Sequence, residues 1–128
     1  DSDVVFTQED IEKIKGHLED KDIITGVYVL GYPPYEPSIY KKENGRYRIH
    51  QPTKIEEIDG CGGGFLAISK KVIQTVPEPF TPVIDENGRE NGNDISFCIR
   101  TQREGFKIYV DPSINVGHIR PKTMYYEI

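Results

Sequence analysis

The residues best suited to chemistry stand in the run Asn91-Gly92-Asn93-Asp94-Ile95-Ser96-Phe97-Cys98. A glycine-containing turn here delivers Asp94 to the start of a predicted amphipathic helix. At that position a carboxylate can serve the helix alone, as an N-cap or as a first-turn acid that the helix dipole favours. It can also act as a general base that takes a proton from an attacking hydroxyl group. The local sequence leaves both roles open.

Two further features could hold a metal ion. Asp1 and Asp3 are separated by one residue and precede Val4-Val5-Phe6, which we interpret as the end of a strand. Carboxylate oxygens suit Mg²⁺ or Mn²⁺, which can bridge to a diphosphate. The alternative is that the two acids are solvated and bind no metal. Near the other end of the chain, His118 could be a metal ligand or a buried histidine held by hydrogen bonds.

A glycine-rich segment, Gly60-Cys61-Gly62-Gly63-Gly64, is expected to interrupt regular structure. Glycines let a backbone approach a ligand closely, and they also allow a tight bend or bulge. The segment is no Walker loop, because no Gly-Lys-Ser/Thr follows it. It is no dinucleotide fingerprint either, because the residues that follow predict a strand rather than a helix.

Other reactive side chains have structural alternatives. Cys61 and Cys98 lack metal-type spacing, so we expect two reduced, partly buried thiols. His17 and His50 are predicted to lie at the surface. Several tyrosines could stack on sugar faces or simply pack half-buried: Tyr32, Tyr35, Tyr40, Tyr125 and Tyr126.

Local patterns predict the elements that position these groups. Thr7 followed by Asp10 resembles a capping box and predicts a helix over residues 8–19. A β-rich run predicts a strand over 22–30. Asn44-Gly45 predicts a type I′ turn between strands over 38–43 and 46–50.

The second half of the chain predicts alternating strands and helices. We expect a short strand or lead-in over 54–59 and a short buried strand over 65–68, then a helix over 70–76 capped by Ser69. A second helix over 93–104 is expected to end at Gly105. A strand over 106–110 should stop at Asp111-Pro112, before an extended segment over 114–119. This order predicts one α/β domain over 1–128, with a mixed sheet, flanking helices and a β-hairpin.

Composition narrows the classes of protein. The 128 residues are 36% hydrophobic and 29% charged, which is typical of a globular domain. The net charge of −5 argues against nucleic-acid binding. No apolar run is long enough to predict a membrane span. No signal peptide is recognised and cysteines are few, so we expect a cytoplasmic protein.

The order of these motifs resembles the second half of a GT-A-fold glycosyltransferase of the family-2-like kind. The shared features are Asp-x-Asp, Gly-Gly-Gly-Phe-Leu-Ala-Ile with the following Ser-Lys-Lys-Val-Ile, Gly-x-Asp-Ile-Ser-Phe-Cys, Gly-Phe-Lys-Ile-Tyr-Val-Asp-Pro and Gly-His. The resemblance covers nearly the whole chain. It is most specific over 62–68 and 92–118.

The resemblance implies transfer of a sugar from a nucleotide diphosphate sugar to a carbohydrate or other hydroxyl acceptor, with inversion. Asp1 and Asp3 match the motif that holds Mn²⁺ or Mg²⁺ on the diphosphate, and His118 matches the histidine that completes the metal site. Asp94 matches the base that deprotonates the acceptor. The three glycines that match the segment lining the donor sugar are Gly62, Gly63 and Gly64.

The sequence departs from the family pattern in two respects. Asn93 stands where the family usually has Glu, which removes a charge beside the base. The nucleoside-binding half that precedes Asp1 in the family is absent, so we expect a partial catalytic domain with an exposed sheet edge that could pair with another copy. The alternative is a non-catalytic α/β sugar-binding or assembly module. A metal-dependent phosphoesterase would need more clustered Asp and His residues than the sequence provides.

Overall fold

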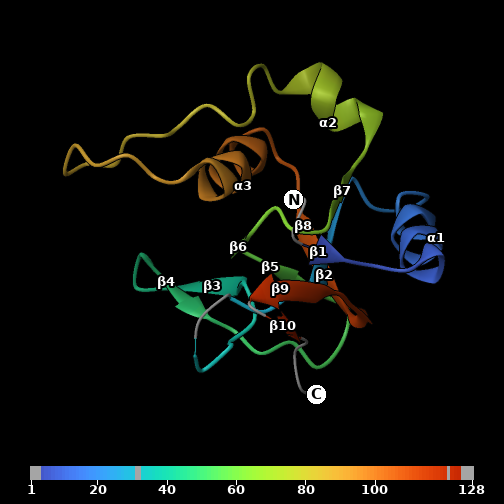
Figure 1. The fold of residues 1–128 in the computed structure, drawn as a ribbon. Coiled ribbons are helices and arrows are strands. Elements are labelled where there is room, and N and C mark those ends of the chain that lie inside the picture. Colours follow the sequence, from blue (N-terminus) through green and yellow to red (C-terminus); the bar gives the residue numbers. More distant parts are fainter. Residues whose placement is uncertain (1–3, 31–32, 121, 125–128) are drawn as a thin grey trace.

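Four strands form a mixed sheet in the computed structural model, which describes residues 4–30, 33–120 and 122–124, with side chains up to residue 117 (Figure 1). The strand order is β5 (Glu56–Ile58), β8 (Ile108–Asn115), β2 (Ile23–Val27), β7 (Leu66–Ile68). The central pair, β2 and β8, is parallel, and each outer strand is antiparallel to its neighbour. The predicted α/β class with a mixed sheet is therefore confirmed.

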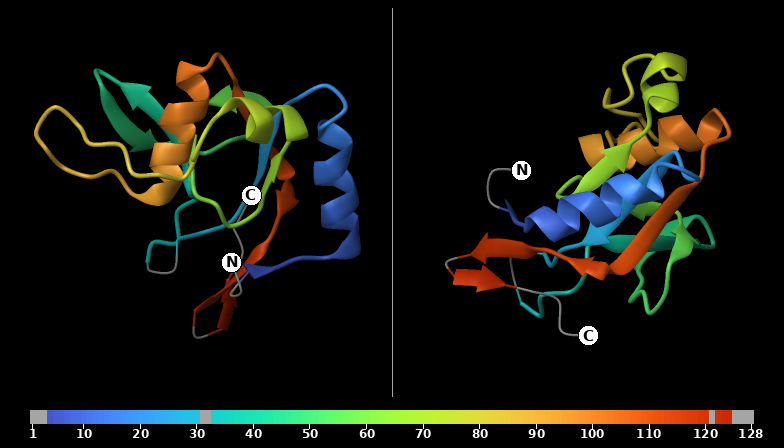
Figure 2. Two further views of the ribbon diagram at one scale, coloured as in Figure 1. Left: turned by 90° about the horizontal axis from the view of Figure 1, so that it is seen from above. Right: turned by 90° about the vertical axis from the view of Figure 1, so that its right-hand side faces the viewer.

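Both faces of β2 are buried, because helices cover the sheet from two sides. Figure 2, seen from above, shows β2 and β8 between α1 (Gln8–His17) and α3 (Asn93–Arg103). Ile23 belongs to the core on the α3 side, whereas Ile24 belongs to the core on the α1 side. This alternation follows from the two-residue period of a strand, and all five residues of β2, including the polar Thr25, are buried.

Helices α1 and α2 begin at the predicted N-caps. Thr7 and Asp10 form a complete capping box at α1, since each side chain accepts a hydrogen bond from the other's backbone. Ser69 caps α2 (Lys70–Thr75). Gly105 follows α3 with a φ of 89°, as its predicted role requires. No helix in the described ranges is long and apolar enough to cross a membrane.

The predicted hairpin is confirmed as β3 (Ile39–Glu43) and β4 (Arg46–Ile49). Asn44 and Gly45 both have positive φ, 52° and 78°, as a type I′ turn requires. The expectation that residues 60–64 lack regular structure is wrong at its start. Gly60 and Cys61 form β6, which pairs with β3 in a second sheet, because the partner strand supplies hydrogen bonds that no local pattern reveals.

A third sheet joins the two ends of the described chain. Its order is β1 (Val4–Val5), β9 (Gly117–Arg120), β10 (Lys122–Met124). β1 and β9 are antiparallel, with Val4 opposite His118 and Val5 opposite Gly117. Residues more than a hundred positions apart in the sequence are thus neighbours in this sheet.

Two other expectations are corrected. β7 is half-buried rather than buried, because it forms an outer strand of its sheet. Asp111-Pro112 does not end a strand. β8 continues through these residues to Asn115, and Ser113 donates backbone and side-chain hydrogen bonds to Asp111 Oδ1 at 2.9 and 2.7 Å. Asp111 Oδ1 thus accepts two hydrogen bonds from Ser113. Pro112, between them, has no N–H to donate.

Candidate functional site

Asp94 is the second residue of α3, so it is a first-turn acid rather than the N-cap. Gly92 occupies the N-cap position and makes no side-chain capping bond. The Asp94 side chain is exposed, and its carboxylate has no hydrogen bond or ion pair within the described part of the chain. Its lone pairs are therefore available to a ligand.

The glycine-rich segment lies against this carboxylate. A Cβ placed on Gly63 would come within 2.8 Å of Asp94 Oδ1. Only a residue without a side chain leaves the carboxylate where it is, because real Cβ contacts are longer than this. The glycine and the acid were predicted to share a site, and the structure brings them into contact across 31 positions of sequence.

Tyr28 lies against the glycines on either side of Gly63. A Cβ on Gly62 would overlap Tyr28 Oη and approach Ser38 Oγ to 2.6 Å, and one on Gly64 would approach Tyr28 Cδ1 to 2.6 Å. The tyrosine is only 9% exposed. The three glycines therefore do different jobs: Gly62 and Gly64 make room for a buried ring, and Gly63 makes room for the acid.

The Tyr28 hydroxyl belongs to a small polar network. Burial is the largest influence on the Tyr28 pKa and raises it, a hydrogen bond with Ser38 opposes this, and the negative charge of Asp94 raises it further. The hydroxyl thus stays protonated at neutral pH. Ser38 also connects the two segments through its backbone, since its N–H donates to Tyr28 O at 3.0 Å and its carbonyl accepts from Gly62 N at 3.2 Å.

A cavity of about 490 Å³ opens beside Asp94. Four segments line it: the loop after β2, the start of β3, the glycine-rich segment and the first turn of α3. The ten lining residues are Tyr28, Leu30, Ser38, Tyr40, Cys61, Gly62, Gly92, Asn93, Asp94 and Ile95. The volume lies within the range usual for small-molecule sites, about 300–1,000 Å³.

The site lies beyond the carboxyl ends of the two parallel strands, where open α/β sheets usually bind ligands. Tyr28 directly follows β2, and Val116, which directly follows β8, donates its N–H to Val27 O at 2.9 Å. The chain then enters β9, whose His118 pairs through its backbone with Val4. His118 thus lies opposite the residue that follows Asp3 in the sequence.

The predicted metal ligands are only partly within the described residues. Asp1 and Asp3 lie outside them, and of His118 only the backbone is described. Among the residues whose placement is described, no group of three or more His, Cys, Asp or Glu side chains could hold a metal ion. The metal site therefore stays a prediction. The pairing of β1 with β9 is compatible with it, because His118 lies opposite Val4, the residue after Asp3.

Two buried thiols lie beneath the site. Cys61 and Cys98 are both free, and Cys98 Sγ donates a weak hydrogen bond to Cys61 O at 3.8 Å. The hydrogen bond with the Cys98 thiol and complete burial hold the pKa of the Cys61 thiol well above its usual value, and the charge of Asp94 adds to this. The expected reduced state agrees with the structure, although the thiols are fully rather than partly buried.

The tyrosine and histidine predictions have mixed outcomes. Tyr40 lines the cavity, whereas Tyr32, Tyr125 and Tyr126 lie outside the described residues. Sequence reasoning missed Tyr28 and Ser38, because Tyr28 has the pattern of a core strand residue and Ser38 precedes a hairpin. The surface assignment of His17 is wrong: its side chain is 16% exposed and its Nε2 lies 2.7 Å from Asp111 Oδ2.

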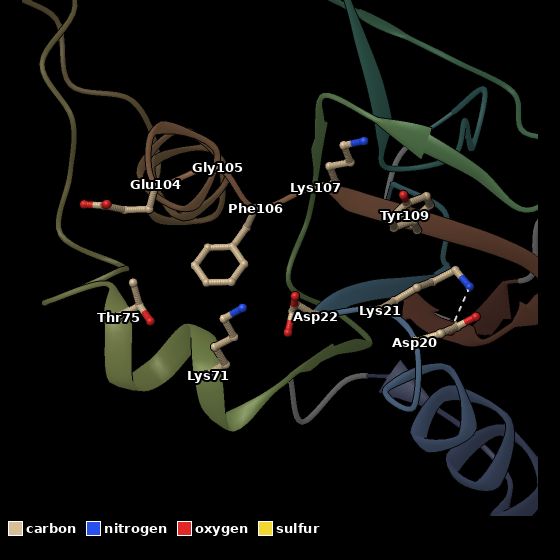
Figure 3. A pocket seen from close by; sticks show the side chains of 10 residues that line it. All are labelled: Asp20, Lys21, Asp22, Lys71, Thr75, Glu104, Gly105, Phe106, Lys107 and Tyr109. Carbon is tan, nitrogen blue, oxygen red and sulfur yellow. Dashed lines mark hydrogen bonds and ion pairs between the residues drawn. The ribbon is translucent and has the colours of Figure 1, made fainter.

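A second hollow lies at the opposite end of the parallel strands (Figure 3). It encloses about 360 Å³, and the Phe106 ring and the Lys71 ammonium group project into it. Acidic side chains from the α1–β2 connection and from the end of α3 balance its lysines, and Lys21 pairs with Asp20 at 3.1 Å. Its lining mixes charges of both signs, and Gly105 is the one glycine among its described lining residues.

Comparison with known proteins identifies a likeness of fold. No family model and no curated protein sequence matches this chain. Among solved structures, the crystal structure of A197 from STIV aligns with a TM-score of 0.67 and 22% sequence identity. The alignment covers 98% of this chain and 63% of that one, so this chain spans less than two thirds of its length. At this identity, the comparison establishes a shared fold alone.

Proposed function

We propose that this chain contributes the acceptor-activating part of a metal-dependent, inverting glycosyltransferase of the GT-A type. The observation that carries the proposal is the contact between Gly63 and Asp94 at the mouth of a cavity beyond the parallel strands. An exposed carboxylate with free lone pairs, held beside a bare backbone segment, can accept a proton from a hydroxyl group in the cavity. The motif order that resembles this family supports the same assignment.

Different residues of the chain have different roles in the proposed reaction. Asp94 accepts the proton of the acceptor hydroxyl as that oxygen attacks the sugar. The Gly62–Gly64 backbone lets the donor sugar approach the acid, and Tyr28 fixes this backbone from below. Asp1, Asp3 and His118 would hold the divalent metal, which would offset the charge that develops on the leaving diphosphate.

Thermal unfolding tests the donor part of the proposal. We expect Mn²⁺ together with UDP or GDP to raise the melting temperature, because a ligand that binds only the folded state stabilises it. Asp3→Asn should abolish the response. Asp94→Asn should keep it, and so should the control Asp20→Asn, whose carboxylate lies on the α1–β2 connection. An unchanged melting temperature with both nucleotides would exclude donor binding by this chain.

The alternative function is a non-catalytic sugar-binding or assembly module with the same fold. Asn93 favours it, because a neutral amide stands beside the acid where the resembling family has a second carboxylate. The two functions differ in turnover. A module would bind sugars yet release no nucleoside diphosphate from any nucleotide sugar, whereas the enzyme would do so in a reaction that needs the metal.

A further inference from the structure

The cavity beside Asp94 is lined almost entirely by uncharged residues. Of the ten described residues that line it, Asp94 alone carries a formal charge. The nearby lysines of β3 point elsewhere: Lys41 Nζ pairs with Glu56 at 2.9 Å, and Lys42 Nζ lies 5.0 Å from the centre of the Tyr47 ring. A phosphate or carboxylate bound here would therefore find no lining cation and would meet the like charge of Asp94.

The remaining lining groups combine hydroxyls with apolar surface. Tyr28, Ser38 and Tyr40 supply hydroxyl groups, while Leu30 and Ile95 supply aliphatic carbon. Sugars present the same combination, because their rings have apolar C–H faces and a rim of hydroxyl groups. A cavity with apolar walls and a few placed polar groups fixes the orientation of such a ligand.

Tyr40 is the aromatic wall of this cavity, and its ring has a defined neighbour. The Tyr40 and Tyr47 rings pack edge to face, with centroids 6.5 Å apart and planes at 80°. The Tyr40 backbone is paired on both sides, with Ile49 of β4 and with Gly60 of β6. A ring positioned in this way offers apolar surface at a low entropic cost on binding.

We propose that the acceptor is an uncharged sugar unit, seated in this cavity with its apolar face on Tyr40 and one hydroxyl group at Asp94. This rests on the proposed glycosyltransferase function for its catalytic meaning. The binding preference itself follows from the cavity alone: neutral glycosides bind, and the same sugars carrying a phosphate or carboxylate bind more weakly.

Saturation-transfer NMR on the 128-residue chain tests this preference. The probes are the methyl glycosides of glucose, galactose and mannose, each compared with its 6-phosphate and, for glucose, with the glucuronide. We expect transfer to at least one neutral glycoside and a weaker signal for its charged counterpart. Equal or stronger binding of the charged sugars, or no binding of any neutral glycoside, would overturn the proposal.

Variants then locate the binding. Tyr40→Ala should weaken binding of the neutral glycoside about fivefold to tenfold, which corresponds to the loss of one aromatic contact. Tyr40→Phe keeps the ring and should retain most of the affinity. Ile84→Ala is the control, since Ile84 is 62% exposed and lines a different hollow. Unchanged binding in Tyr40→Ala, with its fold verified by circular dichroism, would refute the seat on Tyr40.

The outcomes separate this inference from the proposed function. A normal response to Mn²⁺ and nucleotide, combined with preference for anionic glycosides, would refute the acceptor class and leave the donor site standing. Binding of neutral glycosides without any nucleotide response would support the acceptor cavity and refute the donor site.

Discussion

Gly63 and Asp94 are in direct contact, so that a single added methyl group on the glycine would come within 2.8 Å of the acid's Oδ1. The contact joins the loop before β7 to the first turn of α3. It makes the position of the carboxylate depend on a residue that has no side chain.

Gly63→Ala should separate activity from stability. The atom in its way is the end of an exposed, flexible side chain, so the fold can accommodate the methyl group by moving the carboxylate. We expect an almost unchanged melting temperature. In a preparation that is active in the proposed transfer, we expect turnover to fall by up to about 100-fold, because small displacements of a catalytic group are costly. Wild-type turnover in the alanine variant would show that the position of Asp94 does not matter.

Gly64→Ala, in contrast, should lower the stability of the fold. Its methyl group would collide with the Tyr28 ring, which is buried. Overpacking of this kind costs about 1–3 kcal/mol, to be measured by urea unfolding. Gly16→Ala is the matched control, because nothing lies within 4 Å of its Cβ position in α1. An equal stability of the Gly64 and Gly16 variants would contradict the described packing.

Asp94→Asn removes the carboxylate that we propose as the base and preserves the shape of the side chain. In an active preparation we expect turnover to fall about 10²–10⁴-fold, the usual contribution of a general base, with nucleotide binding retained. Steady-state transfer assays and nucleotide titrations measure the two effects separately. Turnover close to wild type would eliminate Asp94 as the base.

The ion pair between His17 and Asp111 predicts a loss of stability in acid. Burial works against the charged form of Asp111, yet hydrogen bonds from His17 and Ser113 outweigh it and lower the pKa of this carboxyl group. A lowered folded-state pKa contributes stability that is present above the unfolded value near 3.8 and is lost as the pH falls through the folded value.

Urea unfolding of the wild type and Asp111→Asn at a series of pH values measures this contribution. We expect a difference of about 1–3 kcal/mol at neutral pH, typical of hydrogen bonds to a charged group, which shrinks below about pH 4. Glu90→Gln serves as the control, because Glu90 is exposed in the loop before α3. A difference that stays constant down to strongly acidic pH would contradict the lowered pKa.

Both thiols should be inert in the folded protein. The thiolate is the reactive form, and a raised pKa together with complete burial suppresses it at Cys61. The hydrogen bond with Cys61 lowers the pKa of the Cys98 thiol, so burial is what keeps reagents from Cys98. We expect Ellman's reagent to modify neither cysteine quickly in the native state and both after unfolding in guanidinium. Rapid native-state labelling of Cys61 or Cys98 would place the thiols nearer the surface than described.

Features set by neighbouring residues could be predicted from the sequence. The capping box of Thr7 and Asp10, the Asn44-Gly45 turn and the glycine after α3 each act within a few positions, so their chemistry is visible in the sequence. The β-rich run over 22–30 likewise predicted a strand, which the structure has as Ile23–Val27. For the same reason, the predicted α/β class and hairpin agree with the structure.

Features that depend on distant partners could not be predicted. Nothing near His17 in the sequence reveals Asp111, which lies 94 positions away, and nothing near Gly60 reveals its pairing with β3. The sequence by itself determined which residues could serve as acid, glycine backbone and aromatic surface. Only the tertiary structure decided that Gly63 contacts Asp94 and that Tyr28 supports Gly62 and Gly64. These contacts depend on how separate elements pack together, and local preferences do not specify that packing.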